Sequence, residues 1–109
     1  MLFVSCAKAP PNLTPQATIA FQNIEIQKSL DLVRDIAQDG NSQNPSVISV
    51  STTRKITLWH ESALKILNAR TVGWKITLMV GLNEVVKDMP QKEQQILSPY
   101  LGLVKELLK

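Results

Sequence analysis

The residues of this chain best suited to catalysis are its single cysteine, Cys6, and its single histidine, His60. A thiolate beside an imidazole is the nucleophile of many hydrolases, and it requires the two side chains to be held in hydrogen-bond contact. Cys6 lies in a Pro-rich opening segment that is poorly suited to holding such a geometry, and His60 lies on the apolar face of an expected helix. We therefore predict a structural core histidine, neutral and hydrogen-bonded to a neighbour, rather than a catalytic base.

Other residue patterns typical of catalysis or cofactor binding do not occur in the sequence. One cysteine and one histidine cannot supply the roughly four ligands of a structural zinc site. Gly73, Gly81 and Gly102 are isolated, so they form no phosphate-binding loop. Asp31 and Asp35 share one helix side without a histidine, which is typical of a solvated face. The sequence therefore predicts a non-enzymatic protein with no cofactor, no metal and no evident small-molecule substrate.

The length and composition predict one compact domain. At 109 residues, of which 44% are hydrophobic, the chain is large enough to bury a core without disulfides. Its net charge of +3 is compatible with an anionic surface as a neighbour but is below that of a dedicated nucleic-acid-binding protein. No segment approaches the roughly 18 apolar residues of a membrane-spanning helix. We expect an N-terminal arm, residues 1–13, followed by one domain over residues 14–109.

The N-terminal arm has the residue pattern of a lipid attachment site. Val4-Ser5-Cys6 and the Pro-rich segment behind it resemble the maturation site of small bacterial or phage-encoded lipoproteins. This resemblance implies that Cys6 is acylated and that the arm spaces a globular domain from a membrane, which would place the protein in the cell envelope. The opening residues lack the basic leader and most of the apolar stretch of such a signal. The alternative is an ordinary cysteine in an arm, with a cytoplasmic or particle-associated protein.

The first helix is expected to begin at Thr14-Pro15. Threonine is a favoured N-cap, and proline suits the first turn because its missing N–H needs no partner there. Gly40 is expected to end this helix. The apolar residues that recur with helical spacing and form its expected buried stripe are Ile19, Ile26, Leu30, Val33 and Ala37.

The next segment, residues 47–53, alternates β-branched with small polar residues and is compatible with a short strand. A single strand would have no partner, so we predict a helix instead, capped by Ser49 or Ser51 and ending near Asn68. Its expected buried face consists of Thr53, Ile56, Trp59 or His60, Ala63, Leu64 and Leu67.

A third helix is expected from about Trp74 to Pro90. Its expected buried face consists of Leu78, Leu82, Val85, Val86 and Met89. Ile76 and Val80 lie off that stripe, which predicts that this helix is the most enclosed of the set. Gly81 inside it, and Gly102 in the following region, are expected to permit close approach of a neighbouring helix.

Residues 91–109 form the last helical region. Ser98-Pro99 interrupts its apolar pattern, which predicts either a kink or two short helices. Every stretch after residue 14 thus favours helix. The predicted fold is all-α, a small bundle of four main helices with an extended Pro-rich N-terminal arm.

Three apolar residues project away from the expected buried stripes and are candidates for binding a partner. Phe21 and Ile24 lie off the stripe of the first helix, and Leu58 lies on the outer face of the second. The alternative is that Phe21 and Ile24 are covered by the protein's own last helix or by its returning N-terminal arm.

Basic residues cluster around the second helix and the turn that follows it. This basic patch consists of Arg54, Lys55, Lys65, Arg70 and Lys75. It would suit the phosphates of nucleic acid or of anionic lipid headgroups. No helix-turn-helix spacing or aromatic stacking platform accompanies it, so we favour a solvated helix face and do not expect nucleic-acid binding. Trp59 and Trp74 are expected to fill core gaps rather than stack on bases.

The sequence as a whole predicts a non-enzymatic helical interaction or assembly module with a protein partner or self-association. Cys6 adds the possibility of a membrane-tethered lipoprotein. One alternative is a small structural subunit of a larger particle, such as a virion, which docks through its N-terminal arm. The other alternative is a basic helical nucleic-acid-associated protein that uses the basic patch.

Overall fold

The computed structural model describes residues 12–109, which form four helices. They are α2 (Pro15–Ser42), α3 (Val50–Ala69), α4 (Trp74–Lys87) and α5 (Gln91–Leu107). No strand occurs within residues 12–109, so the predicted all-α, four-helix fold is confirmed for this part of the chain. The predicted lipid attachment site at Cys6 and almost all of the N-terminal arm lie outside the described residues.

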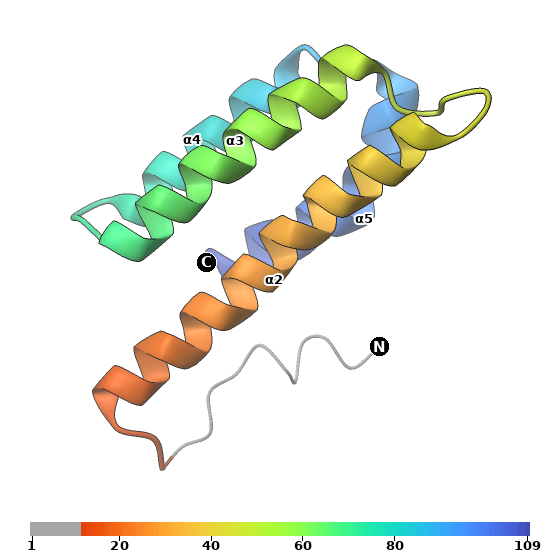
Figure 1. Ribbon diagram of the computed structural model, residues 1–109. Helices are drawn as coiled ribbons and strands as arrows, with labels where there is room; N and C mark the ends of the chain where they lie inside the picture. The colour runs from red at the N-terminus through yellow and green to blue at the C-terminus, as the bar shows by residue number, and fades with distance from the viewer. Residues whose placement is uncertain (1–11) are drawn as a thin grey trace.

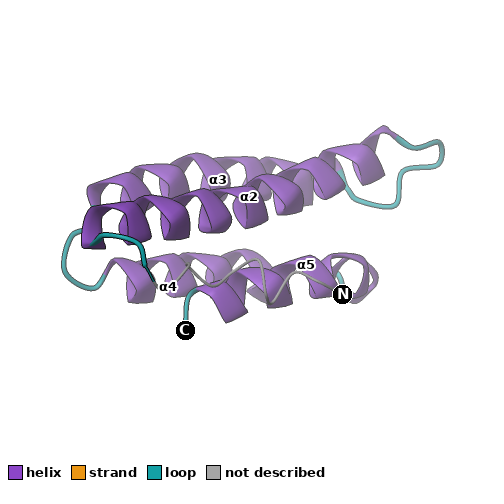
Figure 2. Ribbon diagram, turned by 90° about the horizontal axis from the view of Figure 1, so that it is seen from below, coloured by secondary structure: helices purple, strands orange, loops and turns teal. Residues whose placement is uncertain are grey.

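The helices form a bundle in which consecutive helices run in opposite directions (Figure 1). Seen from below, α2 and α3 form one layer and α4 and α5 form a second layer beneath it (Figure 2). α2 packs against both α3 and α5, and α3 packs against α4. The bundle therefore has two outer seams on opposite sides, one between α2 and α5 and the other between α3 and α4.

Local capping positions the starts of α2 and α3. Thr14 is the N-cap of α2, and its hydroxyl accepts a hydrogen bond from the Ala17 N–H at 3.1 Å. Ser49 is the N-cap of α3 and accepts from the Thr52 N–H at 3.2 Å. Both predicted starts are thereby confirmed, and Ser49 rather than Ser51 is the cap. The rejection of a strand at residues 47–53 is also confirmed, since Val50 onward is helical.

Most residues of the expected stripes are buried. The expected core residues that are only half-buried are Thr53, Leu64, Val85 and Val86. The fully buried residues with the largest side chains are Leu30, Ile48, Ile56, Leu67, Leu78, Leu82, Leu97, Val33 and Val104. Ile19 was expected in the stripe but is 44% exposed. The first turns of α2 extend beyond the C-terminal end of α5 in both views, so Ile19 has little to pack against (Figures 1 and 2).

Gly40 does not end α2, which continues to Ser42. Instead, Gly40 is buried, and its carbonyl accepts hydrogen bonds from the N–H groups of Val47 at 3.0 Å and Ile48 at 3.4 Å. A Cβ at this position would lie 2.5 Å from Cγ1 of Ile48. Glycine is therefore needed here because the returning loop lies directly against the helix.

The expectation that the third helix is the most enclosed is wrong. On α4, Ile76 is 71% exposed and Val80 is 55% exposed. Only Leu78 and Leu82 of this helix are buried, because α4 packs along one side only, against α3 and the shared core. The wide apolar arc of α4 therefore faces outward.

The expected division of the last region into two short helices is also wrong. α5 is a single helix from Gln91 to Leu107 with Pro99 inside it. Pro99 is exposed, so water is available to the carbonyl that loses its N–H partner, while Leu97 and Leu101 on either side are buried. Burial of these flanking side chains holds the helix continuous.

The two helical glycines differ in their surroundings. A Cβ at Gly81 would lie 3.2 Å from Cδ1 of Trp59, which confirms the expected close approach of α3 and α4. A Cβ at Gly102 would have nothing within 4 Å. The expectation of close approach is therefore wrong for Gly102, which lies on the open side of α5.

Replacing Gly102 with alanine is expected to raise the free energy of unfolding by about 0.5–1 kcal/mol. Alanine loses less backbone entropy than glycine on entering a helix, and no neighbour obstructs its methyl group. Urea unfolding followed by circular dichroism measures the change, and the slope against urea should not alter. A lower midpoint for Gly102→Ala would mean that the open space on this side of α5 does not exist in solution.

Candidate functional site

His60 and Asp31 form a pair between α3 and α2. His60 is 3% exposed, and its Nε2 lies 2.6 Å from Oδ1 of Asp31. The Asp31 side chain is 34% exposed, so its carboxylate stands at the edge of the interface. A buried, hydrogen-bonded His60 agrees with the sequence expectation. Its partner was missed, because Asp31 was assigned to a solvated face.

The surroundings of His60 fit a structural role. Within residues 12–109, no serine or threonine hydroxyl forms a hydrogen bond to His60. The three pockets described below are lined by other residues. The pair satisfies a polar group that burial would otherwise penalise, and it links α2 to α3.

Glu93 of α5 caps α3 from outside that helix. It is 8% exposed, and its Oε1 accepts hydrogen bonds from both the N–H and the hydroxyl of Ser49, each at 3.2 Å. A carboxylate at a helix N-terminus is favoured by the exposed N–H groups and the helix dipole. Glu93 therefore ties the starts of α3 and α5 together, a role for which the sequence has no local signal.

The structure divides the basic patch into two parts. Arg70 donates from Nε to Oδ1 of Asn23 at 2.8 Å and stacks over the Trp74 ring, 4.5 Å from its centroid. Lys75 donates to the main-chain carbonyl of Lys109 at 3.2 Å. Arg54, Lys55 and Lys65 are exposed on α3. Arg70 and Lys75 thus have partners within the protein. Of the basic patch, Arg54, Lys55 and Lys65 remain as exposed cations on α3.

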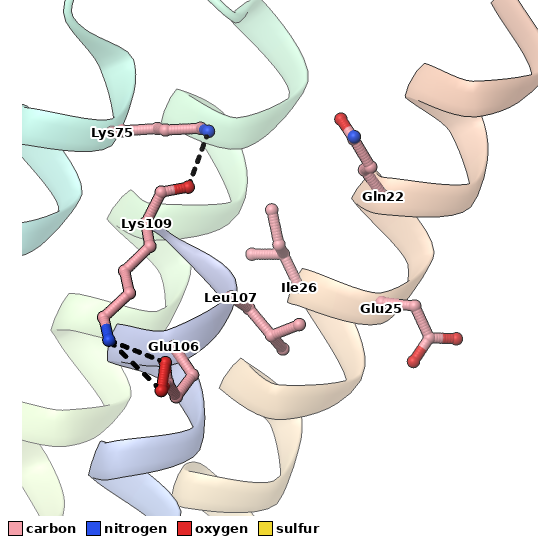
Figure 3. A pocket seen from close by; sticks show the side chains of 7 residues that line it. All are labelled: Gln22, Glu25, Ile26, Lys75, Glu106, Leu107 and Lys109. Atoms are coloured by element: carbon pink, nitrogen blue, oxygen red, sulfur yellow. Dashed lines mark hydrogen bonds and ion pairs between the residues drawn. The ribbon is translucent and has the colours of Figure 1, made fainter. Parts of the chain in front are cut away.

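A small polar pocket of about 200 Å³ opens where α2, α4 and the end of α5 meet (Figure 3). It is lined by Gln22, Glu25, Ile26, Lys75, Glu106, Leu107 and Lys109. Lys109 forms an ion pair with Glu106 at 2.9 Å, so opposite charges in the pocket already satisfy one another. Ile26 and Leu107 form its apolar floor. This arrangement offers a ligand few unpartnered polar groups.

A large apolar opening lies on the outer seam between α2 and α5. This α2/α5 groove has a volume of about 570 Å³ and is lined by Leu32, Ile36, Pro99, Tyr100, Gly102, Leu103 and Glu106. Glycine at 102 leaves the floor open, because no side chain projects there. The sequence analysis missed this groove, although Leu32 and Ile36 are four residues apart on one helix side.

The opposite seam, between α3 and α4, has a smaller opening of about 250 Å³. It is lined by Trp59, Ser62, Ala63, Ile66, Thr77, Leu78, Val80 and Gly81. The Nε1 donor of Trp59 is buried beside Gly81 and has no hydrogen-bond partner among residues 12–109. Trp59 fills the interface between α3 and α4 as expected. Trp74 is half-buried, packs against the core and lies beneath Arg70.

Two of the three candidate partner-binding residues, Phe21 and Ile24, are three residues apart on α2, whereas Leu58 lies on α3. Ile24 is 53% exposed on α2, and Leu58 is 59% exposed on α3. Phe21 is half-buried on α2. Phe21 precedes Leu32 by three helical turns, so both residues lie on the α2 side that borders the α2/α5 groove. Of the three candidates, Phe21 has the clearest relation to an apolar opening.

Two further properties of the described residues bear on function. Within residues 12–109, no group of three or more histidine, cysteine, aspartate or glutamate side chains is placed to hold a metal ion. None of the helices formed by these residues combines the length and apolar character that a membrane span requires. Comparisons of the chain with protein-family models, with curated proteins and with solved structures found no match.

Proposed function

We propose that this chain is a non-enzymatic helical interaction module that binds protein through its α2/α5 groove. The observation that carries the proposal is the groove itself, an opening of about 570 Å³ walled by aliphatic and aromatic side chains. Contiguous apolar surface on a small bundle is costly to leave in water, and it commonly marks an interaction site. Helical grooves of this kind receive apolar side chains from a partner segment.

The polar chemistry of the bundle supports the same proposal. His60, Asp31 and Glu93 are used to join helices to one another, at distances of 2.6–3.2 Å. The polar pocket near Lys75 has charges that pair internally. The main surface feature that these contacts leave unpartnered is therefore exposed apolar area. Such area favours a binding function over a catalytic one.

Site-specific photo-crosslinking in the native source tests the groove. A benzophenone amino acid replaces Tyr100, a groove residue of similar shape, and in a control protein it replaces Asn83, which is exposed on α4. We expect a crosslinked product of one defined mass from position 100 and none from position 83. Equal products from both positions, or none from either, would contradict a groove-specific partner.

The membrane tether is a separate part of the proposal and depends on Cys6. The resemblance to lipoprotein maturation sites implies that lipid is attached to Cys6 and that hydrolysis of the Ser5–Cys6 peptide bond, a separate proteolytic step, releases residues 1–5. Intact mass spectrometry of the protein from its native source is the direct test. A mass that retains Met1 and an unmodified thiol would end the tether and leave the groove proposal in place.

The nucleic-acid alternative has less support than the protein-binding proposal. Arg70 and Lys75 of the basic patch already interact with Asn23, Trp74 and Lys109. If the remaining cations contact phosphate, binding to duplex DNA must weaken steeply as salt rises. We expect weak binding without that steep dependence. The particle-subunit alternative shares the use of the N-terminal arm.

A further inference from the structure

The two outer seams of the bundle differ in shape. The α2/α5 seam carries the apolar groove of about 570 Å³, which no residue among 12–109 fills. On the opposite side, aliphatic side chains project into solvent, since Leu58 of α3 is 59% exposed and Val80 of α4 is 55% exposed. One side of the bundle therefore presents an apolar recess, and the other presents apolar side chains that nothing in the described part of the chain covers.

The two sides also differ in charge. α2 has four carboxylates and two cations, and α5 has two of each, so together these helices have a formal charge of −2. α3 has three cations and one carboxylate, and α4 has two cations and one carboxylate, so together they have a formal charge of +3. The side with the groove is therefore acidic and the side with the projecting apolar residues is basic, which makes them electrostatically complementary.

The positive charge on α3 is concentrated around Leu58. At 3.6 residues per turn, Arg54 and Lys65 lie within about 40° of Leu58 around the helix axis, and Lys55 lies within about 60°. These three cations are exposed, and none of them forms an ion pair within residues 12–109. Leu58 is thus a projecting apolar side chain with three unpaired cations around it.

The rim of the α2/α5 groove carries carboxylates. Glu106 lines the groove itself, where it pairs with Lys109 at 2.9 Å. Asp39 is exposed on α2, three residues after Ile36 and seven after Leu32, so it lies on the same side of the helix as these two groove residues. Asp39 forms no ion pair within residues 12–109 and is available to a cation from outside.

We propose that the α2/α5 groove of one copy of this chain receives Leu58, with the cations around it, from a second copy. This inference rests on the proposed function in taking the groove as the binding surface, and it identifies the protein partner as the chain itself. The two contact surfaces lie on opposite sides of the bundle (Figure 2), so each added copy leaves one groove and one Leu58 surface free. Such a head-to-tail contact builds rings or filaments rather than a closed dimer.

Mixing two variants that each lack one contact surface tests the proposal. Leu58→Glu removes the projecting apolar side chain, and Leu103→Arg places a cation in the groove wall, where it repels the cations around Leu58. In sedimentation velocity, we expect the unaltered full chain to form species larger than a dimer as its concentration rises, and each variant alone to stay monomeric. An equimolar mixture of the variants should form a 1:1 dimer, because the intact groove of one receives the intact Leu58 of the other. An unaltered chain that stays monomeric, or a mixture without a dimer, would overturn the proposal.

Further samples control for folding and for charge. Ile24→Glu is the matched control, because Ile24 is 53% exposed and does not line the groove, and it should leave association unchanged. Gly102→Arg is a second groove variant at an exposed position with open space, and it should behave as Leu103→Arg does. Raising sodium chloride from about 0.01 to 1 M should weaken association of the unaltered chain by about tenfold, because salt screens the opposite charges. Equal loss of association in Ile24→Glu, or association that salt does not change, would contradict the proposal.

This experiment and the crosslinking experiment fail independently. A crosslinked product from position 100 that contains a different protein, together with variants that do not form a mixed dimer, would leave the proposed function standing and overturn self-association. A mixed dimer without any crosslinked product in the native source would support the contact between copies and contradict the proposed function.

Discussion

Replacing Gly40 with alanine is expected to lower the free energy of unfolding by about 1–3 kcal/mol. The new Cβ would lie 2.5 Å from Cγ1 of Ile48 and 3.1 Å from Cγ2 of Val47. Ile48 is fully buried, so it has little room to move away. Alanine is intrinsically better than glycine in a helix by about 0.5–1 kcal/mol, and the overpacking outweighs that gain.

The test compares the free energies of unfolding of Gly40→Ala and Gly102→Ala, measured by chemical denaturation. The two variants carry the same chemical change in a helix, and we expect opposite signs because only Gly40 has a neighbour within reach. A double-mutant cycle with Ile48→Ala identifies the cause, since removing Cγ1 relieves the contact and the combined cost should fall below the sum. Equal stabilisation by both glycine replacements would show that the loop does not press against α2.

Replacing Glu93 with alanine is expected to lower the free energy of unfolding by about 1.5–3 kcal/mol. The change removes the shared acceptor of two Ser49 donors and a negative charge from the N-terminus of α3. Glu93→Gln keeps an acceptor oxygen and should cost less. Thermal or chemical unfolding gives the total effect, and hydrogen exchange of the Ser49 amide reports the lost bond directly.

The matched control for Glu93 is Glu84→Ala. Glu84 is exposed on α4, and its replacement should change stability by no more than about 0.5 kcal/mol. If Glu93→Ala were as mild as this control, or if Ser49 exchange were unaltered, then Glu93 would not cap α3 in solution.

Local features of the fold were predictable from sequence because their determinants are a few residues apart. Thr14 and Ser49 cap their helices through the N–H groups of Ala17 and Thr52, three residues further on. Helical spacing likewise identified the buried stripes, including Leu30 and Leu67. These predictions depend only on backbone geometry within one helix.

Other predictions failed where the outcome depended on what lies beside a residue. Ile19 belongs to an apolar stripe, but its turn of α2 extends past the end of α5. Ile76 and Val80 are exposed because nothing among the described residues covers the outer side of α4. Helical periodicity places a residue on a face, and it does not say whether another helix reaches that face.

The candidate site likewise combines features that the sequence predicts with contacts that only the tertiary structure shows. The sequence by itself determined a four-helix chain, since composition and periodicity are properties of the chain. Only the tertiary structure decided that Asp31 would meet His60, that Glu93 would cap Ser49, and that Leu32 and Leu103 would share a groove. Each of these contacts joins residues on different helices, and their meeting depends on how those helices pack.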